Sequence, residues 1–402
     1  MKQNLKKVII LSAIVGFVCA CSSVLLIRHF NSAAQKQVNV AFYNIPENQA
    51  KVLQENIKKL ELGKVTFKDV TLQDLNKDSA VKSYDLLFAY DGLAAEKFKA
   101  RGGNISSKLF NYLPTSLRRQ NEPNDRKSIP ILLDHFEFSY HKGVASKIGM
   151  EDPQTYSEFE DFLEKSKKHT FTPFFTNGGD DEILLGLISA LIEAKGGYKA
   201  YADFVSAAKK TPSLEKLLTL QLGDSGAFTL QNILDDFRNW QQNGIVHPNW
   251  FNAKYRDILA FMEDGQVAVL FTKLSVHRTI PYKLIRDFST ERAPLASGNV
   301  DHALIAPSLC AIKFSKKSIS DKVIQNLLTE ESQSALSMGS QLGPVALRGE
   351  SFDVQADDVR FFAASCRYGA RADVMAAAFM PGSESAKSLC DSIRRYLATG
   401  RF

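Results

Sequence analysis

The chain has 402 residues, 45% hydrophobic and 23% charged, which is typical of a folded globular protein with more than one ordinary domain. This composition excludes a disordered chain, a collagen and a coiled coil, and five cysteines are too few for a disulfide-rich scaffold. The formal net charge is +6, with three of the positive charges in the first seven residues. The remaining excess is too small to predict a nucleic-acid partner.

The N-terminal segment has the pattern of an export signal or a membrane anchor. Three lysines precede the uncharged, largely apolar run Val8–Ile27, an arrangement that sends the following chain across a membrane. Residues 18–21 (VCAC) resemble a bacterial lipobox, which would place a lipid on Cys21. The apolar run continues past this cysteine, which favours an uncleaved anchor instead. Both interpretations predict a periplasmic or other extracytoplasmic protein held at the cell membrane, with a signal or anchor at 1–21 and a tether at 22–37.

The other cysteines and the histidines give no metal or cofactor motif. Cys310, Cys366 and Cys390 allow at most one disulfide, with Cys366–Cys390 as the favoured pair and three buried thiols as the alternative. The seven histidines show no helical metal-ligand spacing and none lies beside a cysteine. No phosphate-binding glycine loop or nucleophile-elbow motif occurs. We therefore expect no metal and no cofactor.

The region after the tether alternates between strand and helix patterns. The apolar spacing predicts strands over 38–43, 65–70 and 84–90, with a helix over 46–60. This order predicts an open α/β sheet, and ligands of such sheets lie at the carboxyl ends of the strands. Tyr43, Asn44 and Asp91 follow or end two of these strands and are candidate site residues by position.

Further elements follow along the rest of the chain. Thr155 and Glu158 form a capping-box pattern at the start of a helix expected to reach Lys168. An apolar segment at 129–134 precedes an expected strand at 136–141. Other expected elements are strands at 171–176, 267–271 and 304–314, and helices at 183–194, 230–243, 255–264, 320–329, 331–338 and 386–397.

Four segments, in order, resemble the extracellular solute-binding proteins of ABC importers, the maltose-binding-protein-like family 1. They are Ser139–Gly143 with Asp152–Phe159, Phe261–Val269, Pro294–Ala296 with the Leu304–Phe314 strand, and Leu327–Gln333 running to Gly343-Pro344-Val345. Together with the N-terminal strands, the resemblance covers residues 38–350.

The resemblance implies an α/β fold of the two-lobed periplasmic-binding-protein type II, with a ligand cleft between lobes that a multi-strand hinge joins. The expected N-terminal lobe comprises 38–138 plus 300–345, and the C-terminal lobe 139–299 plus 346–402. A protein of this kind is not an enzyme. We expect a monomer that captures a small solute, a sugar or oligosaccharide by family precedent, and delivers it to permease subunits of an ABC transporter.

The resemblance and the strand ends together nominate twelve ligand-binding residues. Asp134 stands where the family has an acid near the hinge, and Ser275 stands where sugar binders have an aromatic platform. Trp250, in a loop, is the better aromatic candidate, because Trp240 lies in a predicted helix and is expected in the core. The full set is Tyr43, Asn44, Tyr90, Asp91, Asp134, Asn177, Asp180, Trp250, Thr272, Lys273, Ser275 and Phe379.

Several of these residues have a structural alternative. Asn44 suits a turn, Asp91 and Asp180 suit helix caps, and Asp134 suits a hinge salt bridge. Lys273 raises the possibility of an anionic ligand instead of a sugar.

Two other functions compete with transport. A secreted hydrolase could use Asp91 with Asp134 or Glu137 as a carboxylate pair. A tethered ligand sensor or surface-interaction protein could be built on the same fold, and the missing aromatic platform favours that alternative.

Overall fold

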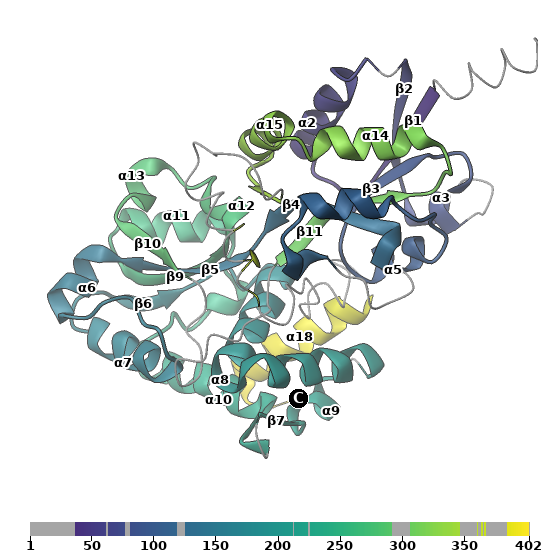
Figure 1. Cartoon of the computed structure of the whole chain (residues 1–402). Coiled ribbons are helices and arrows are strands. Elements are labelled where there is room, and N and C mark those ends of the chain that lie inside the picture. The colour runs from purple at the N-terminus through teal and green to yellow at the C-terminus, as the bar shows by residue number, and fades with distance from the viewer. Residues whose placement is uncertain are drawn as a thin grey trace, which may run out of the picture.

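The computed structural model describes residues 37–401, apart from 62, 77–80, 119–124, 212, 224–225, 292–305, 346–359, 361–362, 365 and 367–383. These residues form two lobes, each built on its own β-sheet (Figure 1). Cys21 and Phe379 lie outside the described residues. Within them, no helix is both long and apolar enough to cross a membrane.

The first lobe contains a six-stranded sheet in the order β12-β4-β11-β3-β1-β2. β1 pairs in parallel with β2 and β3, whereas β11 runs antiparallel to β3 and β4, and β12 antiparallel to β4. The first four residues of β3 are fully apolar and buried, as expected of a strand covered on both faces. The strands are β1 (Gln37–Tyr43), β2 (Lys64–Val70), β3 (Leu86–Tyr90), β4 (Ser128–Asp134), β11 (Ala306–Lys313) and β12 (Gly343–Pro344).

Helices cover both faces of this sheet (Figure 1). One face buries Val38, Val40 and Phe42 of β1 beneath α2, α14 and α15. The other buries Ala41 and Leu87 beneath α3 and α5. The helices are α2 (Glu47–Lys58), α3 (Leu72–Asn76), α5 (Leu93–Lys99), α14 (Ser318–Leu327) and α15 (Glu330–Ser340), with short 3₁₀ turns η1 (Ser107–Tyr112), η2 (Thr115–Leu117) and η3 (Asp125–Lys127).

The second lobe contains a four-stranded sheet in the order β10-β5-β9-β6, with a separate β7–β8 hairpin. β9 pairs antiparallel with β5 and parallel with β6. One face carries the largest core cluster of the described chain, including Phe138, Tyr140 and Phe271. The strands are β5 (Phe136–His141), β6 (Thr172–Phe175), β7 (Gln221–Leu222), β8 (Phe228–Thr229), β9 (Val267–Lys273) and β10 (Phe288–Glu291).

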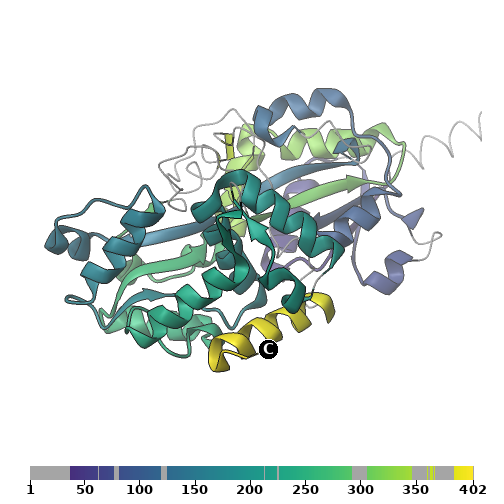
Figure 2. The ribbon, with the colours of Figure 1, turned by 90° about the horizontal axis from the view of Figure 1, so that it is seen from below.

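The helices of the second lobe include a long broken one. α8 changes direction at Gly197, whose φ of 72° suits a glycine, so the break expected after Ala194 is confirmed. α18 packs beside α8, α9 and α10, and is the yellow helix in Figure 2. The helices are α6 (Lys142–Ile148), α7 (Tyr156–Ser166), α8 (Asp181–Lys210), α9 (Leu214–Leu218), α10 (Leu230–Gln242), α11 (Tyr255–Glu263), α12 (Leu274–His277), α13 (Tyr282–Ile285) and α18 (Glu384–Thr399), with the 3₁₀ turn η5 (Trp250–Asn252).

The predicted capping box of α7 is present. Thr155 accepts the backbone N–H of Glu158 at 3.2 Å, and the Glu158 carboxylate accepts the Thr155 N–H at 3.2 Å. These reciprocal bonds satisfy donors that a helix start otherwise leaves without partners.

The lobe boundaries differ from the expected ones at two places. A single residue, His135, joins β4 of the first sheet to β5 of the second. The boundary between the lobes therefore lies at residue 135, three residues before the expected end of the first lobe at 138. Ala363 and Cys366 pack in the first lobe's core cluster, although 346–402 was expected to belong wholly to the second lobe. Both residues therefore belong to the first lobe, as does Val345 at the end of the preceding described segment.

The expected Cys366–Cys390 disulfide is wrong. Cys310, Cys366 and Cys390 are buried thiols, and no disulfide joins any two of them. Cys366 packs in the core of the first lobe and Cys390 in that of the second, which separates the two sulfurs. The structure thus agrees with the alternative prediction of three buried thiols.

Candidate functional site

A cavity of about 430 Å³ lies between the two lobes. The first lobe lines it with the loops that follow β1 and β3, the start of α2 and one residue of β11, and the second lobe with the first turn of α8, the end of β9 and α12. Its position at the carboxyl ends of the parallel strands is the usual ligand position of an open α/β sheet. The lining residues are Tyr43, Asn44, Ile45, Pro46, Gln49, Tyr90, Asp91, Gly92, Glu182, Lys273, Ser275 and Pro307.

Tyr43 and Asn44 bring the end of β1 into the cavity wall. The half-buried Tyr43 ring contacts Phe98 of α5 edge to face, with 5.2 Å between the ring centroids. Asn44 has a φ of 51°, in the left-handed region that Asn tolerates better than most residues with a side chain. Asn44 is therefore both the turn residue that leads into α2 and a lining residue.

Asp91 lines the cavity with a carboxylate that is already paired. Lys99 Nζ lies 3.0 Å from Asp91 Oδ1 and 2.7 Å from Glu96 Oε1. Burial alone would lower the pKa of Lys99, but the carboxylates of Asp91 and Glu96 outweigh it and raise that pKa. Gly92, not Asp91, stands at the cap position of α5. The ion pair fixes the Asp91 side chain at the cavity edge.

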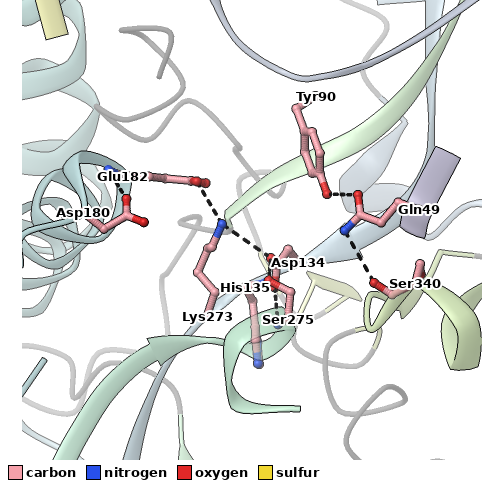
Figure 3. A network of polar contacts seen from close by, with 9 residues as sticks. All are labelled: Gln49, Tyr90, Asp134, His135, Asp180, Glu182, Lys273, Ser275 and Ser340. Atoms are coloured by element: carbon pink, nitrogen blue, oxygen red, sulfur yellow. Dashed lines mark hydrogen bonds and ion pairs between the residues drawn. The ribbon is translucent and has the colours of Figure 1, made fainter. Parts of the chain in front are cut away.

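Gln49 is a lining residue that the sequence reasoning missed. The Tyr90 hydroxyl donates to Gln49 Oε1 at 2.6 Å, and Gln49 Nε2 donates to the backbone oxygen of Ser340 at 3.4 Å (Figure 3). Burial, with a further contribution from the Asp134 carboxylate, raises the pKa of Tyr90. Tyr90 is therefore neutral and directs its hydroxyl to the amide.

Lys273 lies between two carboxylates on the opposite side of the cavity. Its Nζ is 2.9 Å from Glu182 Oε2 and 4.0 Å from Asp134 Oδ2 (Figure 3). Burial alone would lower the pKa of Lys273, but the Glu182 and Asp134 carboxylates outweigh it and raise that pKa. Lys273 is therefore a cation held by two acids. Glu182, in the first turn of α8, was not among the expected site residues.

Asp134 supports the cavity from behind and is absent from its lining. It is 2% exposed and is the last residue of β4, next to the crossing at His135. Its Oδ2 accepts the Ser275 hydroxyl at 2.6 Å, and its Oδ1 accepts the backbone N–H groups of Ser275 at 3.1 Å and His135 at 3.0 Å. Burial raises the pKa of Asp134, although Lys273 and Ser275 oppose that effect. The structure thus gives Asp134 its alternative role, a hinge carboxylate, instead of the expected ligand contact.

A second buried carboxylate lies just beyond the crossing. Glu137 Oε2 is 3.0 Å from His135 Nε2, and the other oxygen contacts His277 Nδ1. Ser139 Oγ lies 3.4 Å from the same nitrogen of His277. Burial alone would raise the pKa of Glu137, but the two histidines outweigh it and lower that pKa to about 2. Because the Glu137 side chain is fully buried, it cannot contact a molecule in the cleft.

Four other expected residues stand apart from the cavity lining. Trp250 is fully buried in the second lobe's core, where its ring packs against Phe237 with 4.7 Å between centroids, so its expected cleft position is wrong. Asp180 is exposed and caps α8 by accepting the Glu182 N–H at 2.9 Å. Asn177 and Thr272 are buried at the ends of β6 and β9. Trp240 is buried in the core as expected.

Among the described residues, no three His, Cys, Asp or Glu side chains are arranged to hold a metal ion. The polar groups that line the cavity are instead carboxylate, ammonium, phenol, amide and hydroxyl groups. Such groups can both accept and donate hydrogen bonds to the hydroxyls of a small polar molecule.

Solved structures of bacterial solute receptors share this architecture. The solute receptor AcbH, described as exclusive for β-D-galactopyranose, superposes with a TM-score of 0.69 at 15% identity, over 91% of this chain and 94% of that chain. A putative binding protein, MsmE of Bacillus subtilis, gives 0.68 at 11%, over 90% and 93%. RafE of Streptococcus pneumoniae gives 0.66 at 16%, over 91% and 94%.

No family model matches the sequence, and no curated protein matches it. At such low identities the structural likeness establishes the fold. The chain has the two-lobed, type II periplasmic-binding-protein fold, with its cavity between the lobes.

Proposed function

We propose that the protein is an extracytoplasmic receptor that captures a sugar or oligosaccharide between its lobes and delivers it to the permease of an ABC importer. The observation that carries this proposal is the polar and aromatic cavity at the strand ends, in a fold shared with receptors that are described as binding sugars. RafE is described in complex with raffinose, and another neighbour as a chitin oligosaccharide binding protein.

The chemistry of the cavity suits hydroxyl groups. The Glu182 and Asp91 carboxylates accept hydrogen bonds, the Lys273 ammonium donates them, and Ser275 can do both. Hydrogen bonds to ionised groups are about twice as strong as neutral ones. Closure of the two lobes on a ligand would exclude water and strengthen these contacts, and the permease could then distinguish the closed state from the open one.

The proposal includes no catalysis. Glu137 and Asp134 were the expected partners of Asp91 in a hydrolytic pair, and both are buried outside the cavity lining. A pair of acids that flanks a scissile bond must reach the substrate.

The proposed anchor is a lipid on Cys21, or else the uncleaved apolar helix. Metabolic labelling with a lipid precursor distinguishes them, with Cys19→Ser as the matched control for Cys21→Ser. Loss of label only in C21S supports the lipid. Membrane association without label in either variant supports the helix.

A ligand screen tests the capture step. The full chain, in a detergent without a sugar headgroup, is unfolded thermally with mono- and oligosaccharides, polyols, amino acids, polyamines or sugar phosphates. A ligand at 100 times its Kd should add about 2.7 kcal/mol, a shift of a few degrees. A sugar hit supports the proposal, and silence across the panel contradicts it.

Uptake tests the delivery step. Cells that lack the protein should take up the labelled hit far more slowly, and the intact gene should restore uptake. Binding with unimpaired uptake in these cells would contradict delivery and support the tethered sensor.

A further inference from the structure

The two walls of the cavity differ in chemical character. The first lobe contributes two aromatic rings and three further apolar residues: Tyr43, Tyr90, Ile45, Pro46 and Pro307. The second lobe contributes only polar residues, namely Glu182, Lys273 and Ser275. Among the described residues, every aromatic group that lines the cavity therefore belongs to the first lobe.

The ring of Tyr43 is held in place before any ligand binds. It is packed against Phe98 and yet remains partly exposed at the cavity. Tyr90 uses its hydroxyl on Gln49, which leaves its ring as apolar surface. Fixed aromatic surface binds the C–H face of a ligand without the cost of ordering a flexible side chain.

The charges near the cavity do not favour an anion. The Lys273 ammonium faces two carboxylates, Glu182 and Asp134. Lys99, the cation on the other side, is paired with Asp91 and Glu96. Carboxylates thus outnumber ammonium groups around both cations, and an incoming anion would meet repulsion from them. The anionic ligand suggested by Lys273 in the sequence is not supported by this arrangement.

We propose that the cavity binds a neutral sugar in a fixed orientation, with one ring face on Tyr43 and its hydroxyls toward Glu182 and Lys273. Tyr43 and Glu182 then determine specificity, Tyr43 for a closed ring and Glu182 for a hydroxyl donor. This inference rests on the proposed function, and adds to it the ligand class and its orientation.

Matched ligands test the class. D-galactose, D-glucose and N-acetylglucosamine are titrated calorimetrically into the full chain, each beside its alditol and its 6-phosphate. We expect at least one neutral ring to bind roughly tenfold or more tightly than both relatives, since the alditol lacks the ring face and the phosphate is repelled. A phosphate or alditol that binds as tightly as its parent overturns the inference and leaves the sugar-receptor proposal intact. If no compound binds, this inference fails, and the wider ligand screen described above decides the sugar-receptor proposal.

Variants test the orientation. Tyr43→Ala should lower the affinity for the bound sugar roughly tenfold. Tyr43→Phe should lower that affinity less than threefold, because the ring face is kept. Glu182→Gln should also lower the affinity for the sugar, because a charge-assisted hydrogen bond is lost. Tyr282→Ala is the matched control, a tyrosine that is 77% exposed on α13 and absent from the cavity lining. Far-ultraviolet circular dichroism checks that each variant is folded. Equal losses in Tyr43→Ala and Tyr43→Phe would overturn the orientation.

Discussion

The two lobes present their polar groups to the cleft in different ways. The first lobe ties Tyr90 to Gln49 and Asp91 to Lys99, so its wall consists largely of rings and internally paired groups. The second lobe presents an ion pair, Lys273 with Glu182, and buries a further acid, Glu137, in its sheet. Both walls therefore offer a paired carboxylate for charge-assisted hydrogen bonds, and only the first wall adds aromatic and other apolar surface. The second lobe also buries Glu137 between two histidines and holds Lys273 against two acids, so we expect substitutions of these residues to cost the most stability. Substitutions of the exposed ring surface of the first wall should mainly change binding.

The largest expected effect is in the second lobe, at Glu137. Glu137→Ala should lower the free energy of unfolding by about 3–5 kcal/mol, because it removes the buried acid between two histidines. Urea unfolding of the full chain measures this change in the free energy of unfolding. Glu164→Ala removes an acid of the same lobe that is 61% exposed and should change stability by at most about 1 kcal/mol. Equal effects in the two variants would contradict the account.

The same carboxylate gives a pH dependence. The pKa of Glu137 is lowered from 4.5 to about 2 in the folded state. Its contribution to stability is therefore complete above pH 4.5 and is lost as the pH falls from there through about 2. Unfolding measured from pH 6 to pH 2 should show a smaller decrease in Glu137→Ala than in the wild type. Parallel curves would contradict this assignment.

The next largest loss of stability is expected at the ion pair in the second lobe's cavity wall, Lys273 with Glu182. Lys273→Met should lower the free energy of unfolding by about 2–3 kcal/mol, because it leaves Glu182 and the buried Asp134 without their cation. Adding Glu182→Gln to that variant should restore part of the loss, because one uncompensated charge is removed. Additive losses in the double variant would show that the two side chains do not interact.

The smallest effect is expected at Asn44, in the first wall. Asn44→Ala should cost about 1 kcal/mol, since alanine is disfavoured at a φ of 51°, whereas Asn44→Gly should leave stability nearly unchanged. Thermal unfolding measures the stability of the two variants against the wild type. If Asn44→Gly is stable but binds the sugar less tightly, the amide contacts the ligand. Equal destabilisation by Ala and Gly would contradict the backbone explanation.

Local patterns predicted what depends on local structure. Apolar patterns predicted most strands of the two sheets, although not β10 or β12, and Thr155 with Glu158 predicted a capping box that the structure confirms. The strand ends predicted Tyr43, Asn44 and Asp91 as candidate site residues, and all three line one cavity.

The remaining features of the site depend on tertiary contacts, which the sequence patterns do not reveal. Nothing near Trp250 in the sequence separates a cleft residue from a core residue. Its burial depends on Phe237 and on Gly178, where an added Cβ would lie 2.7 Å from the indole ring. Gln49 and Glu182 sit in the first turns of helices, where polar residues are ordinarily solvent-exposed. Only the approach of the two lobes makes them lining residues, although a helix start beside a strand end could have suggested both.

Hydrogen exchange with and without the bound sugar tests most directly whether one ligand bridges the two walls. The account predicts slower exchange in peptides from both lobes at once, those that contain residues 43–49 and 90–92 and those that contain 182 and 273–275. Backbone amides distant from the cavity, such as those of α13, should be unaffected. Protection confined to one lobe, or found only away from these segments, would contradict a binding site between the lobes.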